Sequence, residues 1–266
     1  MQKSRLNRLR LRLSFKGILI LTLSLTFLPI VVSYAGVSNT KHDLSASGPG
    51  TIKAQAVSEK CVFCHTPHAT TDVYPLWNRN LSTATYTVLP AAQPTDTRLT
   101  SPGQPDGSSK LCLSCHDGTV AIGLLLNTPG RGTTYPTAIS MLGVSGVTPE
   151  CPAGGCIPTT AGGYIGTDLT NKHLVSIEFD QGLVDQKNNV QCPSGKVSTG
   201  LQLPASGDVV KLRPTSHDNG YGQNTGKGIQ CRTCHDPHDN ANGAFLVKGT
   251  PSNYNPLCET CHILCP

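Results

Sequence analysis

The sequence predicts a fold made mostly of irregular coil, with short α-helices and few short strands. The 266 residues include 27 Gly and 20 Pro but only one Trp and five Phe, which is a poor supply of large side chains for an ordinary core. Three long stretches, 91–107, 143–163 and 191–207, are rich in Pro, Gly, Ser and Thr. No segment keeps an amphipathic period over several turns, so long helices are not expected.

Four Cys-x-x-Cys-His motifs suggest what fills the interior instead. They are CVFCH at Cys61–His65, CLSCH at Cys112–His116, CRTCH at Cys231–His235 and CETCH at Cys258–His262. In such a motif the two thiols bond covalently to a haem, and the adjacent histidine binds its iron. Cys-x-x-Cys alone also serves zinc sites and redox thiol pairs, but the histidine that follows every copy favours haem. We therefore expect a multihaem cytochrome c, wrapped around four covalent haems c per chain.

The motifs assign the first set of site residues. The haem-binding thiols are those of Cys61, Cys64, Cys112, Cys115, Cys231, Cys234, Cys258 and Cys261. The iron ligands on the same side of each haem are His65, His116, His235 and His262. Short helical turns are expected at Ser58–His65, Lys110–His116 and Pro256–His262, and short strands at Lys172–Phe179 and Val209–Leu212.

The N-terminus is typical of a secretory signal peptide over residues 1–35. Residues 1–16 carry six basic side chains and no acidic one: Lys3, Arg5, Arg8, Arg10, Arg12 and Lys16. An apolar run from Gly17 to Val32 follows, and small residues before Gly36 predict cleavage after Ala35. The alternative is an uncleaved anchor helix, but Pro29 and an apolar length short of about 20 residues argue against it.

Removal of the leader also removes the basic charge of the chain. The whole sequence has 21 basic and 16 acidic residues, and the loss of six basic ones leaves 15 against 16. The basic balance of the full chain is therefore no evidence for nucleic acid binding. Covalent haem attachment takes place outside the inner membrane, so we expect a secreted, cell-surface or periplasmic protein without a stable membrane span.

The order of short motifs repeats along the chain. KH-x-x-S, CxxCHxPH and LCxxCH follow one another in the first part, and the same three signals recur in the second part with different spacings. We therefore divide the mature chain into a first dihaem module, residues 36–148, and a second dihaem module with inserted loops, residues 149–266.

The remaining histidines indicate the chemistry of the irons. Five are left after the motifs are counted: His42, His68, His173, His217 and His238. Met141 is the single methionine beyond the leader, so bis-histidine ligation fits better than ligation by methionine at every iron. An iron with two protein ligands has no open position for substrate. Electron transfer is thus expected rather than an enzyme; a multihaem oxidoreductase and a membrane-bound quinol-oxidising protein are the alternatives.

Position in the sequence suggests which iron each histidine serves. His68 and His238 each lie three residues after a motif histidine, across Pro67 and Pro237, and so cannot readily reach the far face of their own haem. We assign His68 to the haem of the second motif and His238 to that of the fourth, the alternative being surface histidines. His42 and His173, which occupy equivalent places in the repeat, then serve the other two haems. His217 has no repeat partner and is taken as spare.

Several blocks beyond the haem motifs resemble a known family. KHDLS, CVFCHTPH, the block Tyr74–Arg79 (YPLWNR), CLSCHDGTVA, HLVSIEFD and CRTCHDPH together resemble the doubled-CxxCH multihaem cytochromes. Among these the chain is similar to the tetrahaem outer-surface cytochromes that polymerise into extracellular filaments. The resemblance implies a loop-rich subunit with a continuous row of stacked bis-histidine haems, and in filament-forming members one ligand that crosses between subunits.

Filament assembly gives His42 a possible second role. It lies seven residues from the expected mature N-terminus, beside a Gly/Ser-rich arm (45–50) that is long enough to reach a neighbour. A head-to-tail contact that does not close into a ring produces a filament. We expect a homopolymer of this kind, with other redox proteins as further partners and His42 as the bridging ligand. The alternative is a monomeric periplasmic carrier in which His42 binds a haem of its own chain.

Four cysteines lie outside the motifs: Cys151, Cys156, Cys192 and Cys265. An even number in an exported protein suggests disulfides, and four thiols allow three connectivities. We favour a small loop closed by Cys151 and Cys156, which leaves Cys192 to pair with Cys265. The other connectivities, and an extra metal ligand, stay open.

N-terminal sequencing of the exported protein tests the leader. We expect Gly36 as the first residue, because a signal peptidase reads the small side chains at 33 and 35. An Ala35→Leu variant should remain uncleaved, whereas the control Tyr34→Ala should be cleaved at the same bond. A mature chain that begins at Met1 would contradict the assignment.

Overall fold

The structure is a computed structural model. It describes residues 36–66, 76–89, 103–127, 138–188, 199–216 and 226–264. Residues 35–266 form one compact unit, distinct from residues 1–34. In the part of the chain that is described, no helix has the length and hydrophobicity to cross a membrane. The following residues with expected roles lie outside it: the leader 1–35, Pro67, His68, Tyr74, Pro75, Cys192, His217 and Cys265.

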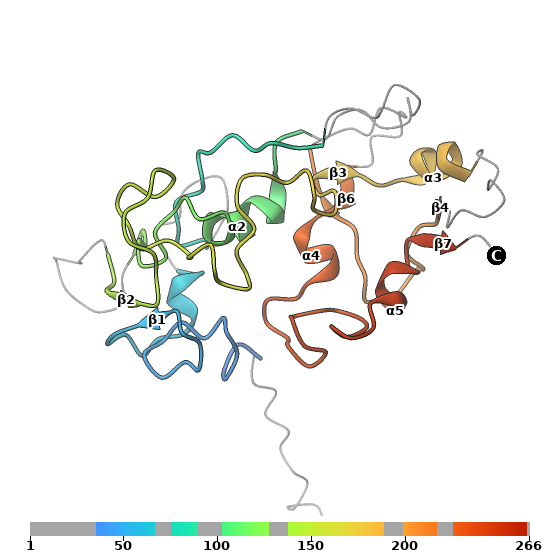
Figure 1. Cartoon of the computed structure of the whole chain (residues 1–266). Helices are drawn as coiled ribbons and strands as arrows, with labels where there is room; N and C mark the ends of the chain where they lie inside the picture. Colours follow the sequence, from blue (N-terminus) through green and yellow to red (C-terminus); the bar gives the residue numbers. More distant parts are fainter. Residues whose placement is uncertain are drawn as a thin grey trace, which may run out of the picture. The chain divides into compact units, whose positions relative to one another are not determined.

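Short helices carry the four Cys-x-x-Cys-His motifs (Figure 1). The helices are η1 (Cys61–Phe63, a 3₁₀ turn), α2 (Gly107–His116), α3 (Gln181–Asn188), α4 (Cys231–Cys234) and α5 (Asn255–Cys258). All but α3 contain or begin a motif. The expected turns at the first, second and fourth motifs are therefore present, although α5 ends at Cys258 rather than reaching His262.

The strands are two or three residues long and form small antiparallel sheets. They are β1 (Lys53–Ala54), β2 (Met141–Leu142), β3 (Ile177–Glu178), β4 (Thr199–Leu201), β5 (Arg213–Pro214), β6 (Lys227–Ile229) and β7 (His262–Leu264). β1 pairs with β2, β4 pairs with β7, and β6 lies between β3 and β5. Most of the described chain is coil.

Both of the expected strands differ from those in the structure. The strand expected at Lys172–Phe179 is reduced to β3, because Ser176 has a φ of 58° and this left-handed conformation interrupts an extended chain. The segment Val209–Leu212 is not a strand, and pairing with β6 starts at Arg213. His262 begins β7 because it pairs with Leu201, a partner far away in the sequence.

Each motif turn is closed by its own backbone hydrogen bonds. The amide of His65 donates to the carbonyl oxygen of Cys61 at 2.8 Å, and the amide of His235 donates to that of Cys231 at 3.0 Å. In such a turn, residues three positions apart lie on the same side. Both thiols of a motif are therefore presented to one side of the chain, which is what attachment to a single haem requires.

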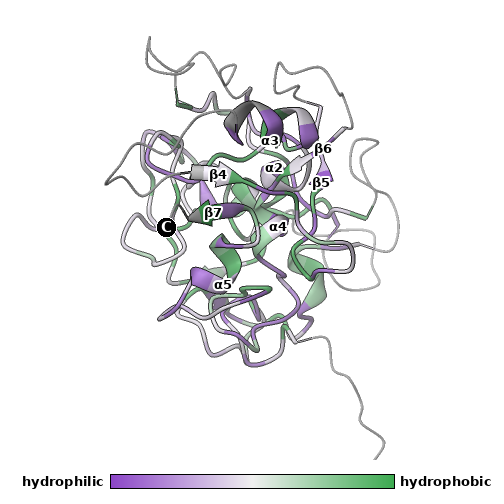
Figure 2. Cartoon of the chain, turned by 90° about the vertical axis from the view of Figure 1, so that its right-hand side faces the viewer, coloured by the Kyte–Doolittle hydropathy of each residue, from purple (hydrophilic) through white to green (hydrophobic). Residues whose placement is uncertain are grey.

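Hydrophobic residues are spread over many short segments of the chain (Figure 2), and among the described residues their side chains form four small clusters instead of one large core. Each cluster contains a residue of a motif or one packed against it. Phe63, in the first motif, belongs to one cluster, and Leu113, in the second motif, belongs to another. Cys234 of the third motif and Cys261 of the fourth each pack against one of the two remaining clusters. The apolar contacts therefore support the motif turns individually.

Buried polar side chains join the first two motifs to each other. The Nδ2 of Asn78 donates to the carbonyl oxygens of Val62 and Asn127, each at 2.7 Å. The neighbouring Arg79 is 1% exposed, and its guanidinium donates to the carbonyl oxygens of Ile122 (2.6 Å), Ala121 (2.9 Å) and Ser114 (3.3 Å). Val62 belongs to the first motif and Ser114 to the second, so this Asn-Arg pair connects them.

One of the expected disulfides is confirmed. Cys151 and Cys156 are bonded, and they close a small loop whose backbone also pairs Gly155 with Ser145. Among the described residues, the cysteines without a disulfide are the eight of the motifs. The pairing of Cys192 with Cys265 stays a prediction.

An Arg79→Met variant tests the contribution of the buried guanidinium. Methionine has a similar length but cannot donate, so three buried carbonyl oxygens lose their partner. We expect unfolding to become easier by about 2 kcal/mol, measured by thermal and denaturant unfolding. A matched Lys172→Met change at an exposed cation should leave the stability within about 0.5 kcal/mol of the parent. Equal stability of the two variants would contradict a structural role for Arg79.

Candidate haem site

Three of the four motif histidines are oriented by a hydrogen bond between the ring and the backbone. The Nδ1 of His116 lies 2.6 Å from the carbonyl oxygen of Gly163, and the Nδ1 of His235 lies 2.9 Å from that of Ala244. His65 has a corresponding hydrogen bond to the backbone of Leu76. Because a carbonyl can only accept, Nδ1 carries the proton, and the lone pair of Nε2 is left for a metal.

Two further histidines have the same arrangement. The Nδ1 of His173 lies 2.9 Å from the carbonyl oxygen of Leu174, and the Nδ1 of His42 lies 3.5 Å from that of Pro237. His238 instead has the carboxylate of Asp236 3.7 Å from its Nδ1. His173 and His42 are therefore oriented in the same way as His116 and His235, whereas His238 is not.

Histidine rings meet in three pairs within the described residues. The ring centroids of His65 and His238 are 5.9 Å apart, those of His42 and His116 are 6.0 Å apart, and those of His173 and His262 are 6.2 Å apart. Each pair joins one motif histidine to one histidine outside the motifs. In this part of the chain no three or more metal-binding side chains converge on one point.

The three separations fit two imidazoles on opposite sides of one iron. A metal–nitrogen bond of about 2 Å places each ring centroid roughly 3 Å from the metal, so two opposed rings are about 6 Å apart. Direct contact between stacked rings would be shorter: His42 and Phe245 are stacked with centroids 4.1 Å apart. The residues present therefore fit bis-histidine haem, with the neighbouring thiols as the points of attachment.

The pairing differs from the one expected from the sequence. His238 lies beside the first motif instead of the fourth, His42 beside the second, and His173 beside the fourth. The reason is that the N-terminal segment packs on the loop after the third motif: a Cβ on Gly36 would lie 2.6 Å from the carbonyl oxygen of His238. This contact brings the two modules together where sequence order places them far apart.

The remaining motif, the third, has no second histidine opposite its own among the described residues. His235 is oriented by Ala244, but no histidine ring in this part of the chain faces it as in the other three pairs. His68 and His217 lie outside the described residues. The second motif, to which His68 was assigned, already has a histidine opposite its own, because His42 faces His116.

His42 lies in an enclosed aromatic environment. Burial, and then the nearby His116, lower the pKa of His42 to about 4. Burial is also the main cause of the lowered pKa of His65, His116 and His262. Since neutral imidazole is the form that binds iron, the positions that lower these pKa values also favour ligation.

The thiols show which motifs are neighbours. Burial and then Cys115 raise the pKa of Cys64 to about 12, so the first motif lies next to the second. Burial and then Cys261 raise the pKa of Cys234 to about 11, so the third motif lies next to the fourth.

The two thiols Cys112 and Cys231 influence each other most strongly: their interaction raises the pKa of Cys112 and lowers that of Cys231 to about 7, so the second motif lies next to the third. The four attachment sites therefore follow one another in space in the same order as in the sequence.

Four supporting residues were not identified as functional from the sequence: Leu76, Trp77, Ala244 and Phe245. Trp77 packs edge-on against His65, with ring centroids 5.9 Å apart, and belongs to the YPLWNR block that the family resemblance singled out. Phe245 stacks on His42 but lies in a segment with no recognisable pattern. Leu76, Ala244 and Phe245 all have positive φ, so strained backbone concentrates where the ligand histidines are held.

Comparison with known proteins agrees with the motif analysis. A family model for the doubled CXXCH motif matches residues 224–263, which include the third and fourth motifs. A search of curated proteins gives no significant match. The motif match supports a multihaem c-type cytochrome-like protein that binds haem covalently and takes part in electron transfer.

A His238→Ala variant tests the pairing with the first motif. Loss of one axial imidazole should convert one iron per chain from low-spin to high-spin, as measured by EPR and absorption, and added imidazole should restore the low-spin signal. In a Cys61→Ala/Cys64→Ala background, which lacks the first attachment site, the same change should produce no high-spin iron. A high-spin signal in that background would show that His238 serves a different motif.

Proposed function

We propose that the protein is an extracytoplasmic tetrahaem c-type cytochrome that carries electrons along a row of bis-histidine haems. We further propose that it is a subunit of an extracellular filament. The observation that carries the electron-transfer proposal is the set of three histidine pairs with centroids 5.9–6.2 Å apart. Four motifs, neighbouring one another in sequence order, support a row of four haems.

The chain's own residues have three tasks in this function. Bound haem supplies an iron that cycles between the ferric and ferrous states. The paired imidazoles would both bind the iron of such a haem, which would leave no position for a substrate and favours transfer over catalysis. Histidine at both positions, in place of methionine, also favours low reduction potentials. The eight thiols fix each cofactor covalently, so an exported protein cannot lose it by dilution.

Filament assembly is supported by the family resemblance, and the count of histidines permits a ligand from a neighbouring subunit without requiring one. His235 has no opposing ring among the described residues, so its second ligand comes from His68, from His217 or from a neighbouring subunit. His42 is a weaker candidate for the bridging ligand than the sequence suggested. Its ring stacks on Phe245 and faces His116 of its own chain, which supports the intramolecular alternative for this residue.

A monomeric carrier is the second candidate function, and the same placement of His42 favours it. Electron microscopy of the purified mature protein separates the two: filaments support assembly, whereas single particles support the carrier. A His42→Ala variant should form one high-spin iron but should keep the assembly state of the parent, and the adjacent exposed Lys41→Ala is the matched control. Loss of filaments in His42→Ala but not in Lys41→Ala would support His42 as the ligand that bridges two subunits.

Haem analysis tests the electron-transfer proposal directly. We expect four haems c per mature chain, all low-spin in the ferric state, by the alkaline pyridine spectrum and by EPR. Fewer than four haems, or zinc in their place, would contradict the tetrahaem assignment. Binding of carbon monoxide or nitrite at one iron without denaturation would instead support an enzyme.

A further inference from the structure

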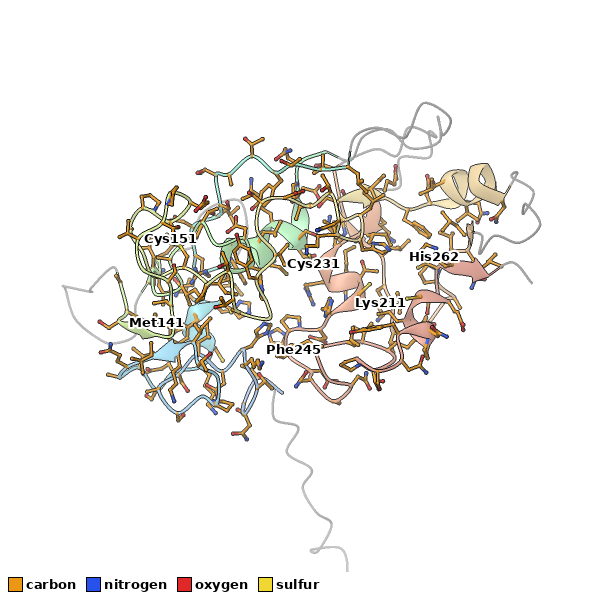
Figure 3. The ribbon with its side chains drawn as sticks, in the orientation of Figure 1. Met141, Cys151, Lys211, Cys231, Phe245 and His262 are labelled. Carbon is orange, nitrogen blue, oxygen red and sulfur yellow. A yellow bond between two sulfur atoms is a disulfide. The ribbon has the colours of Figure 1, made fainter. Side chains whose placement is uncertain are left out.

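The contact between the second and third motifs differs from the other contacts between motifs, because it joins the two modules. α2 packs against α4, so Cys112 of α2 lies close to Cys231 at the start of α4 (Figure 1). Figure 3 labels Cys231 at the start of α4. Any electron that passes from the first module to the second through the row must cross this junction.

A buried glutamine organises the junction. Gln230 precedes Cys231 and is 1% exposed. Its Oε1 accepts the amide hydrogen of Ser109 at 2.9 Å, and its Nε2 donates to a carboxylate oxygen of Asp106 at 2.7 Å. In return, the Oγ of Ser109 accepts the amide hydrogen of Cys231 at 3.0 Å. The start of α2 and the start of α4 are therefore joined by reciprocal hydrogen bonds.

The surrounding residues hold this network in place. The carboxylate of Asp106 also accepts hydrogen bonds from the amide of Ser216 at 2.6 Å and from its hydroxyl at 2.8 Å. Gly107 has a φ of 46°, and a Cβ there would lie 2.8 Å from the carbonyl oxygen of Pro214 and 3.2 Å from the Nε2 of Gln230. The close approach of the two helices thus requires glycine at 107.

We propose that Gln230 and Ser109 are positioning residues for electron transfer between the second and third haems, because their hydrogen bonds hold the start of α2 against the start of α4, the two helices that carry these motifs. The inference rests on the proposed function. When both motifs carry haem, one electron passes from a ferrous iron at one motif to a ferric iron at the other, so that one is oxidised as the other is reduced. No bond forms or breaks and no proton moves; other redox proteins supply and remove the electron.

Two substitutions test the positioning role in the mature, haem-loaded protein. Ser109→Ala removes the acceptor for the Cys231 amide. It preserves helix formation at this position and the hydrogen bond from the backbone amide of residue 109 to Gln230. Gln230→Glu keeps the acceptor for Ser109 but places a second carboxylate oxygen against Asp106. Ser108→Ala is the matched control, since Ser108 lies in the same helix and its buried hydroxyl has no hydrogen-bond partner in the described structure.

The readouts are the exciton couplet in Soret circular dichroism and the magnetic coupling between ferric haems in EPR. We expect Ser109→Ala to lose part of both signals and Gln230→Glu to lose more. Ser108→Ala should match the parent, and all variants should retain four low-spin haems. If Gln230→Glu does not fold, Ser109→Ala alone decides the result.

Two outcomes would overturn the inference: unchanged couplet and coupling in Ser109→Ala, or the same loss in Ser108→Ala. A parent protein with fewer than four haems would instead contradict the proposed function, and the haem count distinguishes this failure from the other two.

Discussion

The distance of about 6 Å between paired histidine rings is the constraint on which the rest of the structure depends. Each pair has to be kept far enough apart to admit a metal and close enough for both rings to bind it. Three observations show how the chain does this: the Nδ1 atoms are fixed by backbone carbonyls, Trp77 and Phe245 pack against two of the rings, and the backbone is strained at Leu76, Ala244 and Phe245. These features would have little purpose in a chain that only had to fold.

Buried polar residues take over part of the task that a large hydrophobic core performs elsewhere. Asn78 and Arg79 connect the first motif to the second, and Gln230 with Ser109 connects the second to the third. At the fourth motif the connection is partly exposed: the side chain of Lys248 is 35% exposed, and its ammonium group donates to Thr260 at 3.2 Å and to Asp208 at 2.9 Å. A buried hydrogen bond depends on direction as well as distance, so such connections fix the relative positions of attachment sites more precisely than apolar contact does.

The sequence predicted the local features and missed the long-range ones. The motif turns and the disulfide between Cys151 and Cys156 were predictable, because their geometry is decided by a few neighbouring residues. The partners of His65 and His262 were not, since sequence order does not show that the N-terminal segment packs on the loop after the third motif. Phe245 carried no signal because its role arises only when His42 is brought to it from the other module.

The pairing of His65 with His238 has a consequence for the order in which the molecule matures. Synthesis starts at the N-terminus, so the first attachment site is complete in its thiols and its own histidine long before residue 238 exists. Its second imidazole arrives only with the C-terminal part of the chain. The contact order of this histidine pair is therefore high, and its formation has to wait for the C-terminal part of the chain. If the two rings bind one iron as proposed, a chain truncated before residue 238 would lack the second ligand at the first motif.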